Sequence, residues 1–159
     1  SGRPNTFAMA VWGVAFFGGK HEVVGALAKL KSYLDYGTVQ PIQIAATVVM
    51  NEESDYPLEV NEIYQSRRDS LIRGLDRIGW QVDPPKGTMF VWAPSPEPYS
   101  EMGSVGFCKH LVESSNVALS PGVGFGPGGE GYVRFALVEN EHRIRQAITQ
   151  LGNGLEQLS

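Results

Sequence analysis

Residues 120–137, SPGVGFGPGGEGYVRFAL, lead from a glycine-rich loop into an apolar run and decide how the second half of the chain folds. The run Tyr132–Leu137 is rich in aromatic and branched side chains and predicts a strand. Gly124, Gly126 and Gly129 have the spacing of a dinucleotide-binding loop, but such a site requires a helix directly after the loop. Because a strand follows instead, we expect the loop to turn the backbone between two strands and not to bind a nucleotide.

The residues on either side of this stretch predict short strands and two helices. Apolar runs bounded by turn residues predict strands at Gln81–Val82, Thr88–Trp92 and Val117–Leu119. Apolar residues at helical spacing predict helices near Val105–Ser114 and over about Glu139–Leu158. Between them, the prolines of Pro94–Pro98 cannot continue a ladder and predict a surface loop. The second half is therefore expected to be a small α/β layer.

The first half of the chain predicts one strand followed by three helices. The apolar run Val11–Phe17 predicts a buried strand, and helical periodicity follows in three segments. These segments are Lys20–Leu34, Ile42–Met50 and Pro57–Ile78, the last of them ended by Gly79. The second helix is almost wholly apolar at Ala45–Val49, so we expect it to be packed on several sides.

Composition excludes several classes of protein. The 159 residues are 42% apolar and 19% charged, close to the globular average, so the chain should bury a core. A net charge of -4 supplies no basic field, and we expect neither nucleic acid nor an anionic membrane as partner. No apolar stretch approaches the length of a membrane span. Cys108, the single cysteine, excludes an internal disulfide and predicts a small buried thiol in a soluble, cytoplasmic protein.

Several segments, taken in order, resemble the landmarks of class I/II aminotransferases, which depend on pyridoxal phosphate (PLP). They are Leu30–Gly37, Arg67–Asp69, Thr88–Trp92, Ser120–Gly122 with Phe125–Gly126, and Tyr132–Leu137. The similarity runs from about Thr6 to the end of the chain. The branch that it resembles most acts on alanine, aspartate or diaminopimelate-like substrates.

The resemblance implies a fold and a division into domains. Fold-type I PLP enzymes have a large domain that holds the cofactor and a small C-terminal domain that closes over the substrate. By this resemblance, residues 1–50 are a remnant of the large domain, and residues 51–159 are the small domain with its long connecting helix. The expected class is α/β (α+β), a small sheet packed with helices. The first half of the enzyme has no counterpart here, so we expect a detached or truncated domain.

The resemblance also locates two positions on which the family's chemistry depends. A lysine holds PLP as a Schiff base and moves a proton, and an arginine contacts the cofactor phosphate. The run Thr6–Gly13 matches the segment around them, which puts Asn5 at the lysine position and Gly13 at the arginine position. An amide nitrogen is not a nucleophilic amine, and glycine has no guanidinium. We therefore expect no catalytic residue, no firm retention of PLP and no transamination by this chain alone.

Arg134 is the one site residue that the resemblance carries over. The family uses an arginine in this last strand to hold the α-carboxylate of the amino acid, and the planar guanidinium suits a bidentate hold on carboxylate. The alternative is an arginine on the wet face of an edge strand.

Other polar residues receive structural interpretations. Lys20, Lys29, Lys31, Lys86 and Lys109 lie on polar helix faces or in turns and predict solvated charges. The acidic segment Glu139–His142 predicts the capped first turn of the last helix, where the helix dipole favours negative charge. A metal site is not expected there, since its one histidine lacks partners at metal-ligand spacing. Tyr36–Gln40 predicts either a turn between helices or, by the resemblance, a surface at the family's dimer interface.

Three functions remain open at this point. The chain is an aminotransferase-derived domain that is inactive alone, or a complementing half whose partner chain supplies the missing domain, or a module that binds a small carboxylate or mediates oligomerisation. The corresponding partners are a second copy of the chain, another chain that carries the large domain, and an amino acid or keto acid.

Overall fold

The computed structural model describes residues 15–51 and 54–155 of the chain. Its residues fall into two compact units, Ser1–Val60 and Asn61–Ser159. The predicted boundary at residue 50 stays a prediction.

The first unit contains two helices and the start of a third. Helix α1 spans His21–Leu34, α2 spans Gln40–Asn51, and α3, Tyr56–Arg77, begins here. Glu22 lies in the first turn of α1 and Lys31 in its last, the charge order that a helix dipole favours. All three helices begin and end within two residues of the predicted bounds.

Two expectations for the first unit need correction or fall outside the structure. Residues 11–14 of the predicted strand lie outside the described residues, Ala15 forms an isolated bridge, and residues 16–20 have no regular structure. Helix α2 was expected to be packed on several sides, but Ala46 is its buried residue, while Ile44 is 56% and Val48 42% exposed. The apolar composition of α2 therefore marks a surface that this chain leaves exposed.

The second unit is a three-stranded antiparallel sheet with helices on one face. Strands β1 (Phe90–Pro94) and β2 (Ser120–Pro121) flank the central strand β3 (Tyr132–Ala136). Helices α4 (Gly103–Ser115) and α5 (Glu141–Gly154) complete the layer with the rest of α3. Short 3-10 helices lie at Tyr99–Met102 (η1), Gly122–Phe125 (η2) and Pro127–Gly129 (η3). The mixed helical and antiparallel arrangement confirms the expected fold class.

The core of the second unit lies between the sheet and the helices. Strand alternation buries Val91 and Ala93 of β1 together with Val133 and Phe135 of β3. Trp80, just after α3, packs its ring edge-on against Phe107 at 5.5 Å and Phe135 at 5.4 Å. Its indole nitrogen donates to the Pro94 carbonyl oxygen at 2.9 Å, which satisfies the one polar atom of the ring.

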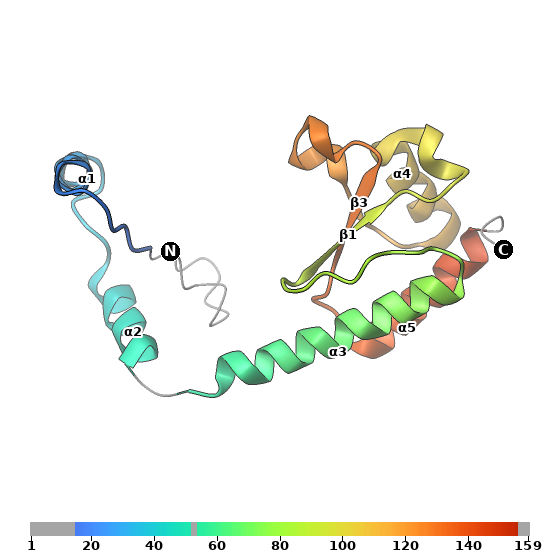
Figure 1. Cartoon of the computed structure of the whole chain (residues 1–159), viewed down its shortest axis with the longest axis horizontal. Helices are drawn as coiled ribbons and strands as arrows, with labels where there is room; N and C mark the ends of the chain where they lie inside the picture. Colours follow the sequence, from blue (N-terminus) through green and yellow to red (C-terminus); the bar gives the residue numbers. More distant parts are fainter. Residues whose placement is uncertain (1–14, 52–53, 156–159) are drawn as a thin grey trace. The chain divides into compact units, whose positions relative to one another are not determined.

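Helices α3 and α5 run side by side (Figure 1), and a glycine lies at their contact. A Cβ on Gly74 of α3 would lie 2.7 Å from the Cγ1 of Ile148 on α5, so any larger residue would force the Ile148 side chain to move. Arg67 of α3 donates to the Leu137 carbonyl oxygen at 3.0 Å, which ties the same helix to the end of β3.

The short strands differ from their predicted bounds. Residues 81–85 form no strand, and β1 begins at Phe90 and continues to Pro94, which the sequence placed in a loop. Proline is tolerated there because β1 is an edge strand. Residues 117–119 also form no strand, since Val117 N donates back to the carbonyl oxygen of Leu111 and pairing with β3 begins only at Ser120.

The described helices include none that is both long and apolar enough to cross a membrane.

Candidate functional site

Arg134 lies on the face of the sheet opposite the core. In β3 the buried positions are Val133 and Phe135, so Tyr132, Arg134 and Ala136 point to the other face. Arg134 pairs in register with Trp92 of β1 and Ser120 of β2. The strand is central, so the alternative of an arginine on an edge strand is wrong. A half-buried cation in mid-sheet needs specific neighbours.

Two aromatic rings supply those neighbours. The guanidinium carbon of Arg134 lies 4.1 Å from the ring centroid of Phe90 and 4.1 Å from that of Phe125. Trp92 supports this arrangement, because its ring contacts Phe125 edge-on at 5.8 Å and stacks on Tyr132 at 5.8 Å. Stacking on aromatic faces is favourable for a guanidinium and leaves its N–H groups directed along the plane of the cation.

The Nε of Arg134 is buried and has no hydrogen-bond partner among the described residues. A buried donor without a partner is costly, and a planar guanidinium with free donors matches the two oxygens of a carboxylate. The geometry therefore suits an anionic ligand with two oxygens in one plane.

The sequence motifs included these aromatic residues but assigned no role to them. Phe90 lies within Thr88–Trp92 and Phe125 within the glycine-rich segment, both quoted as landmarks. Alternation along β1 places Phe90 and Trp92 on one face, a pattern readable from sequence. That Phe125 reaches the same cation depends on the path of the loop, which no periodicity predicts.

The glycine-rich loop is held by close backbone contact and by Glu130. A Cβ on Gly122 would lie 2.1 Å from the carbonyl oxygen of Gly129, so the two glycines allow the loop to close on itself. The Glu130 carboxylate accepts from the backbone N of Ser104 at 2.5 Å. This bond, with weaker ones from Gly131 N and the Ser104 hydroxyl, lowers the pKa of Glu130 below its usual range against an opposing desolvation effect. The loop leads into β3, as expected, and not into a helix.

Asn5 and Gly13, the positions matched to the family's lysine and phosphate arginine, lie outside the described residues. The lysines of the described residues occupy solvated positions. Lys20, Lys29, Lys86 and Lys109 are exposed, and the ammonium of Lys31 pairs with Asp35.

Cys108 is buried in α4, as predicted, and burial raises the pKa of its thiol. A raised pKa disfavours the reactive thiolate, so this side chain fills the core.

The histidines lie apart from the candidate site. His110 stacks on Tyr99 with ring centroids 5.2 Å apart. His142 lies in the first turn of α5, whose N-cap is Asn140, with its side-chain oxygen accepting from Arg143 N at 3.1 Å. The predicted capping of this helix is thus confirmed. Within residues 15–51 and 54–155, no group of three or more His, Cys, Asp or Glu side chains is placed to hold a metal ion.

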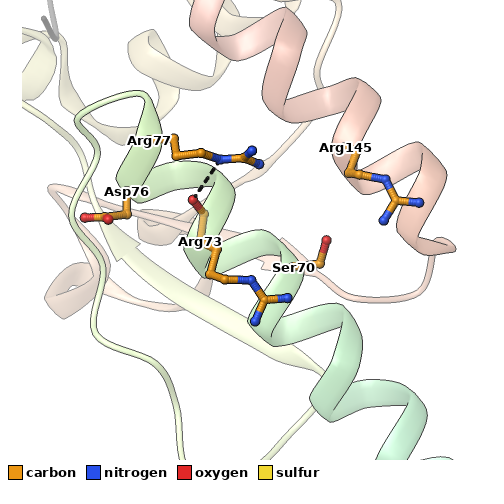
Figure 2. A pocket seen from close by; sticks show the side chains of 5 residues that line it. All are labelled: Ser70, Arg73, Asp76, Arg77 and Arg145. Atoms are coloured by element: carbon orange, nitrogen blue, oxygen red, sulfur yellow. Dashed lines mark hydrogen bonds between the residues drawn. The ribbon is translucent and has the colours of Figure 1, made fainter.

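A separate open groove of about 410 Å³ runs between α3 and α5 (Figure 2). Its lining residues are Ser70, Arg73, Asp76, Arg77 and Arg145. Figure 2 shows the Arg77 Nε donating to the backbone oxygen of Arg73, at 3.3 Å, and the Asp76 carboxylate pointing away from α5. This groove contains none of the side chains predicted for the site.

The sequence matches the model of the family described as aminotransferase class I and II over residues 5–151. It is 49% identical over 146 residues to the putative aminotransferase AatC of Rhizobium meliloti, covering 92% of this chain and 36% of that protein. It is 48% identical over 143 residues to the glutamate-pyruvate aminotransferase AlaC of Escherichia coli, covering 90% of this chain and 35% of that protein. The chain thus spans about a third of the length of the curated relatives that it matches.

The similarity extends to a solved structure. The aromatic aminotransferase from Pyrococcus horikoshii superposes with a TM-score of 0.90 at 25% identity, covering 99% of this chain and 43% of that one.

Proposed function

The chain belongs to the class I and II aminotransferases, and on this premise we propose that it supplies the part of such an enzyme that binds the carboxylate of an amino acid or keto acid. Arg134 is the proposed binding residue. The observation that supports this assignment is the guanidinium, which contacts the rings of both Phe90 and Phe125 and whose buried Nε is unpaired among the described residues.

The two rings prepare Arg134 for a carboxylate in two ways. They hold the guanidinium in place, so that a ligand need not order the side chain on binding. They also take the place of water beside the cation, which strengthens the charge-assisted hydrogen bonds that it makes to a carboxylate. The α-carboxylate shared by amino acids and 2-oxo acids is the ligand of matching shape and charge.

The described residues do not fit the family's cofactor. PLP acts as an electron sink and requires a lysine amine to carry it. The described lysines are exposed or, at Lys31, paired with a carboxylate, whereas a Schiff-base lysine is desolvated in a pocket. The resemblance puts Asn5 at the lysine position. We propose accordingly that this chain does not transaminate by itself, and we assign no chemical step to PLP.

A complementing half is the second candidate, supported by the apolar surface of α1. Leu27 is 38%, Leu30 55% and Leu34 71% exposed, and they recur at helical spacing on one face. A contiguous exposed apolar face marks an interaction surface. In this version another chain covers α1 and supplies the lysine.

Calorimetric titration with pyruvate and 2-oxoglutarate tests the carboxylate site. We expect Arg134→Gln to weaken binding by about tenfold or more, since charge-assisted hydrogen bonds are lost, and Arg134→Lys to weaken it less. Arg73→Gln, which removes an exposed arginine from α3, is the matched control and should change nothing. Equal affinity of the wild-type chain and Arg134→Gln contradicts the assignment.

Borohydride reduction after incubation with PLP, followed by intact mass and peptide mapping, tests the absence of a Schiff-base lysine. We expect no stoichiometric adduct at a single residue. One pyridoxyl phosphate group confined to one lysine would overturn the proposed inactivity.

A further inference from the structure

Glu130 joins the end of the glycine-rich loop to the first turn of α4. One carboxylate oxygen accepts from Ser104 N at 2.5 Å and from Gly131 N at 3.3 Å, and the other accepts from the Ser104 hydroxyl at 3.2 Å. Gly103 permits this approach, because a Cβ there would lie 3.1 Å from the carboxylate and its φ of 67° disfavours other residues. The loop is thus attached to α4 just before β3 begins.

Ser104 extends the attachment to the beginning of the loop. Its side chain is fully buried, and its hydroxyl oxygen accepts from Val123 N at 3.3 Å while the hydroxyl donates to Glu130. The close contact of Gly122 with Gly129 joins the same two ends of the loop. Glu130 and Ser104 therefore connect α4 to both ends of residues 122–131.

Phe125 lies between these two attachments. This residue is 53% exposed, and its ring contacts Trp92 and the guanidinium of Arg134. These contacts can form only while the loop backbone keeps the ring within reach of the sheet. A loop released from α4 would let the ring leave the guanidinium.

We propose that Glu130 is a positioning residue that fastens the loop 122–131 to α4 and so holds the Phe125 ring over Arg134. The effect on ligand affinity rests on the proposed function of Arg134, whereas the effect on the ring does not. Charge alone predicts the opposite sign. A chain with one negative charge fewer attracts a carboxylate more strongly, whereas releasing the ring weakens the binding of a carboxylate.

The test combines side-chain NMR of Arg134 with keto-acid titration in the full chain. Ring currents from Phe90 and Phe125 shift the Arg134 side-chain protons upfield, and Arg134→Lys identifies these signals by their loss. In Glu130→Gln we expect the signals to move downfield toward their positions in Phe125→Leu, and pyruvate affinity to fall by about threefold or more. Glu113→Gln, which changes an exposed carboxylate at the other end of α4, should leave both unchanged.

A double variant separates positioning from a general structural effect. In the Phe125→Leu background, Glu130→Gln should move the Arg134 signals no further, because the ring that it positions is absent. Far-ultraviolet circular dichroism checks that each variant is folded. If Glu130→Gln does not fold, Ser104→Ala provides the same comparison, since it removes the hydroxyl that links Glu130 to Val123.

Unmoved Arg134 signals in a folded variant, or tighter binding of pyruvate, would overturn the proposal. If the signals move as expected and the wild-type chain binds no keto acid, the proposed function fails and the positioning by Glu130 stands.

Discussion

At the scale of single residues, the two rings that contact Arg134 are the feature on which the proposed function rests. A cation over an aromatic ring gains about 0.5–2 kcal/mol, depending on how far it is desolvated. Phe90 and Phe125 each make this contact with the same guanidinium. The site is therefore built from the sheet and from one loop residue together.

Replacing Phe125 by Leu should weaken keto-acid binding with little loss of stability. The ring is half-exposed, so its removal costs little burial, while the guanidinium loses one stacking partner. We expect affinity to fall by about threefold or more and the free energy of unfolding to change by less than about 1 kcal/mol. Titration calorimetry measures the affinity, and urea denaturation measures the free energy of unfolding. Phe17→Leu, at another exposed phenylalanine, should alter neither.

Glu130 should make stability depend on pH. Its folded-state pKa is lowered, chiefly by the Ser104 N–H bond, so its contribution is present above the unfolded value of about 4.3 and is lost as pH falls through the lowered folded value. Glu141 and Asp35 have lowered pKa values too, so the wild-type chain alone cannot isolate the effect. We expect the stability difference between the wild-type chain and Glu130→Gln to shrink with acidification below about pH 4.3 in urea titrations. A difference that does not depend on pH contradicts this account.

At the scale of elements, the N-terminus of α5 depends on one cap. The side-chain oxygen of Asn140 accepts from Arg143 N, one of the donors that an α-helix leaves free at its start. Asn140→Ala should lower the free energy of unfolding by about 1 kcal/mol. Asn153→Ala, an exposed asparagine near the other end of the same helix, is the control and should cost much less. Equal losses in urea denaturation would show that the cap is not the cause.

The contact between α3 and α5 reverses the usual effect of replacing glycine in a helix. Alanine has a helix propensity about 1 kcal/mol better than glycine, but a Cβ on Gly74 would overlap the Ile148 side chain at 2.7 Å. We expect Gly74→Ala to destabilise the protein by about 1–3 kcal/mol. Gly106→Ala in α4 meets only Met102 Cβ at 3.4 Å and should be neutral or stabilising. Thermal unfolding that ranks the two variants in the other order contradicts the packing argument.

At the scale of the whole molecule, the two units bury their apolar residues unequally. The second unit has a continuous core, whereas α1 buries no residue and exposes Leu30 and Leu34. An exposed apolar face such as that of α1 contributes to stability only when another protein surface covers it.

If α1 is covered by a second copy of the chain, Leu30→Lys should lower the mass in solution. We expect light scattering to give more than the 17.3 kDa of one chain for the wild-type protein and a value nearer to one chain for the variant. Lys29→Ala, a neighbouring exposed change, is the control. A wild-type monomer excludes the second copy as the cover and leaves a different chain as the remaining candidate.

Some elements of the fold could be predicted from the sequence and others could not. Helices with long apolar periodicity were predicted almost to the residue, as α1 and α3 illustrate, because the pattern repeats over many turns. The predictions of strands at residues 81–82 and 117–119 were wrong, because a run of two or three apolar residues does not distinguish a strand from a buried loop. The prediction that α2 is packed on several sides was also wrong. Composition shows which residues a helix could bury, but it does not show which other segments lie beside the helix.

By itself, the sequence determined the family and the fold class, since each depends on residue types in a fixed order along the chain, and it made Arg134 the candidate site residue. Only the tertiary structure decided that Arg134 lies on the central strand, that Phe90 and Phe125 both contact it, and that Glu130 accepts from Ser104 N of α4. The physical reason is that these contacts depend on how separate segments come together. Phe90 reaches Arg134 through strand pairing, and the glycine-rich loop depends on close backbone approach at Gly122 and Gly129, neither of which a one-dimensional pattern specifies.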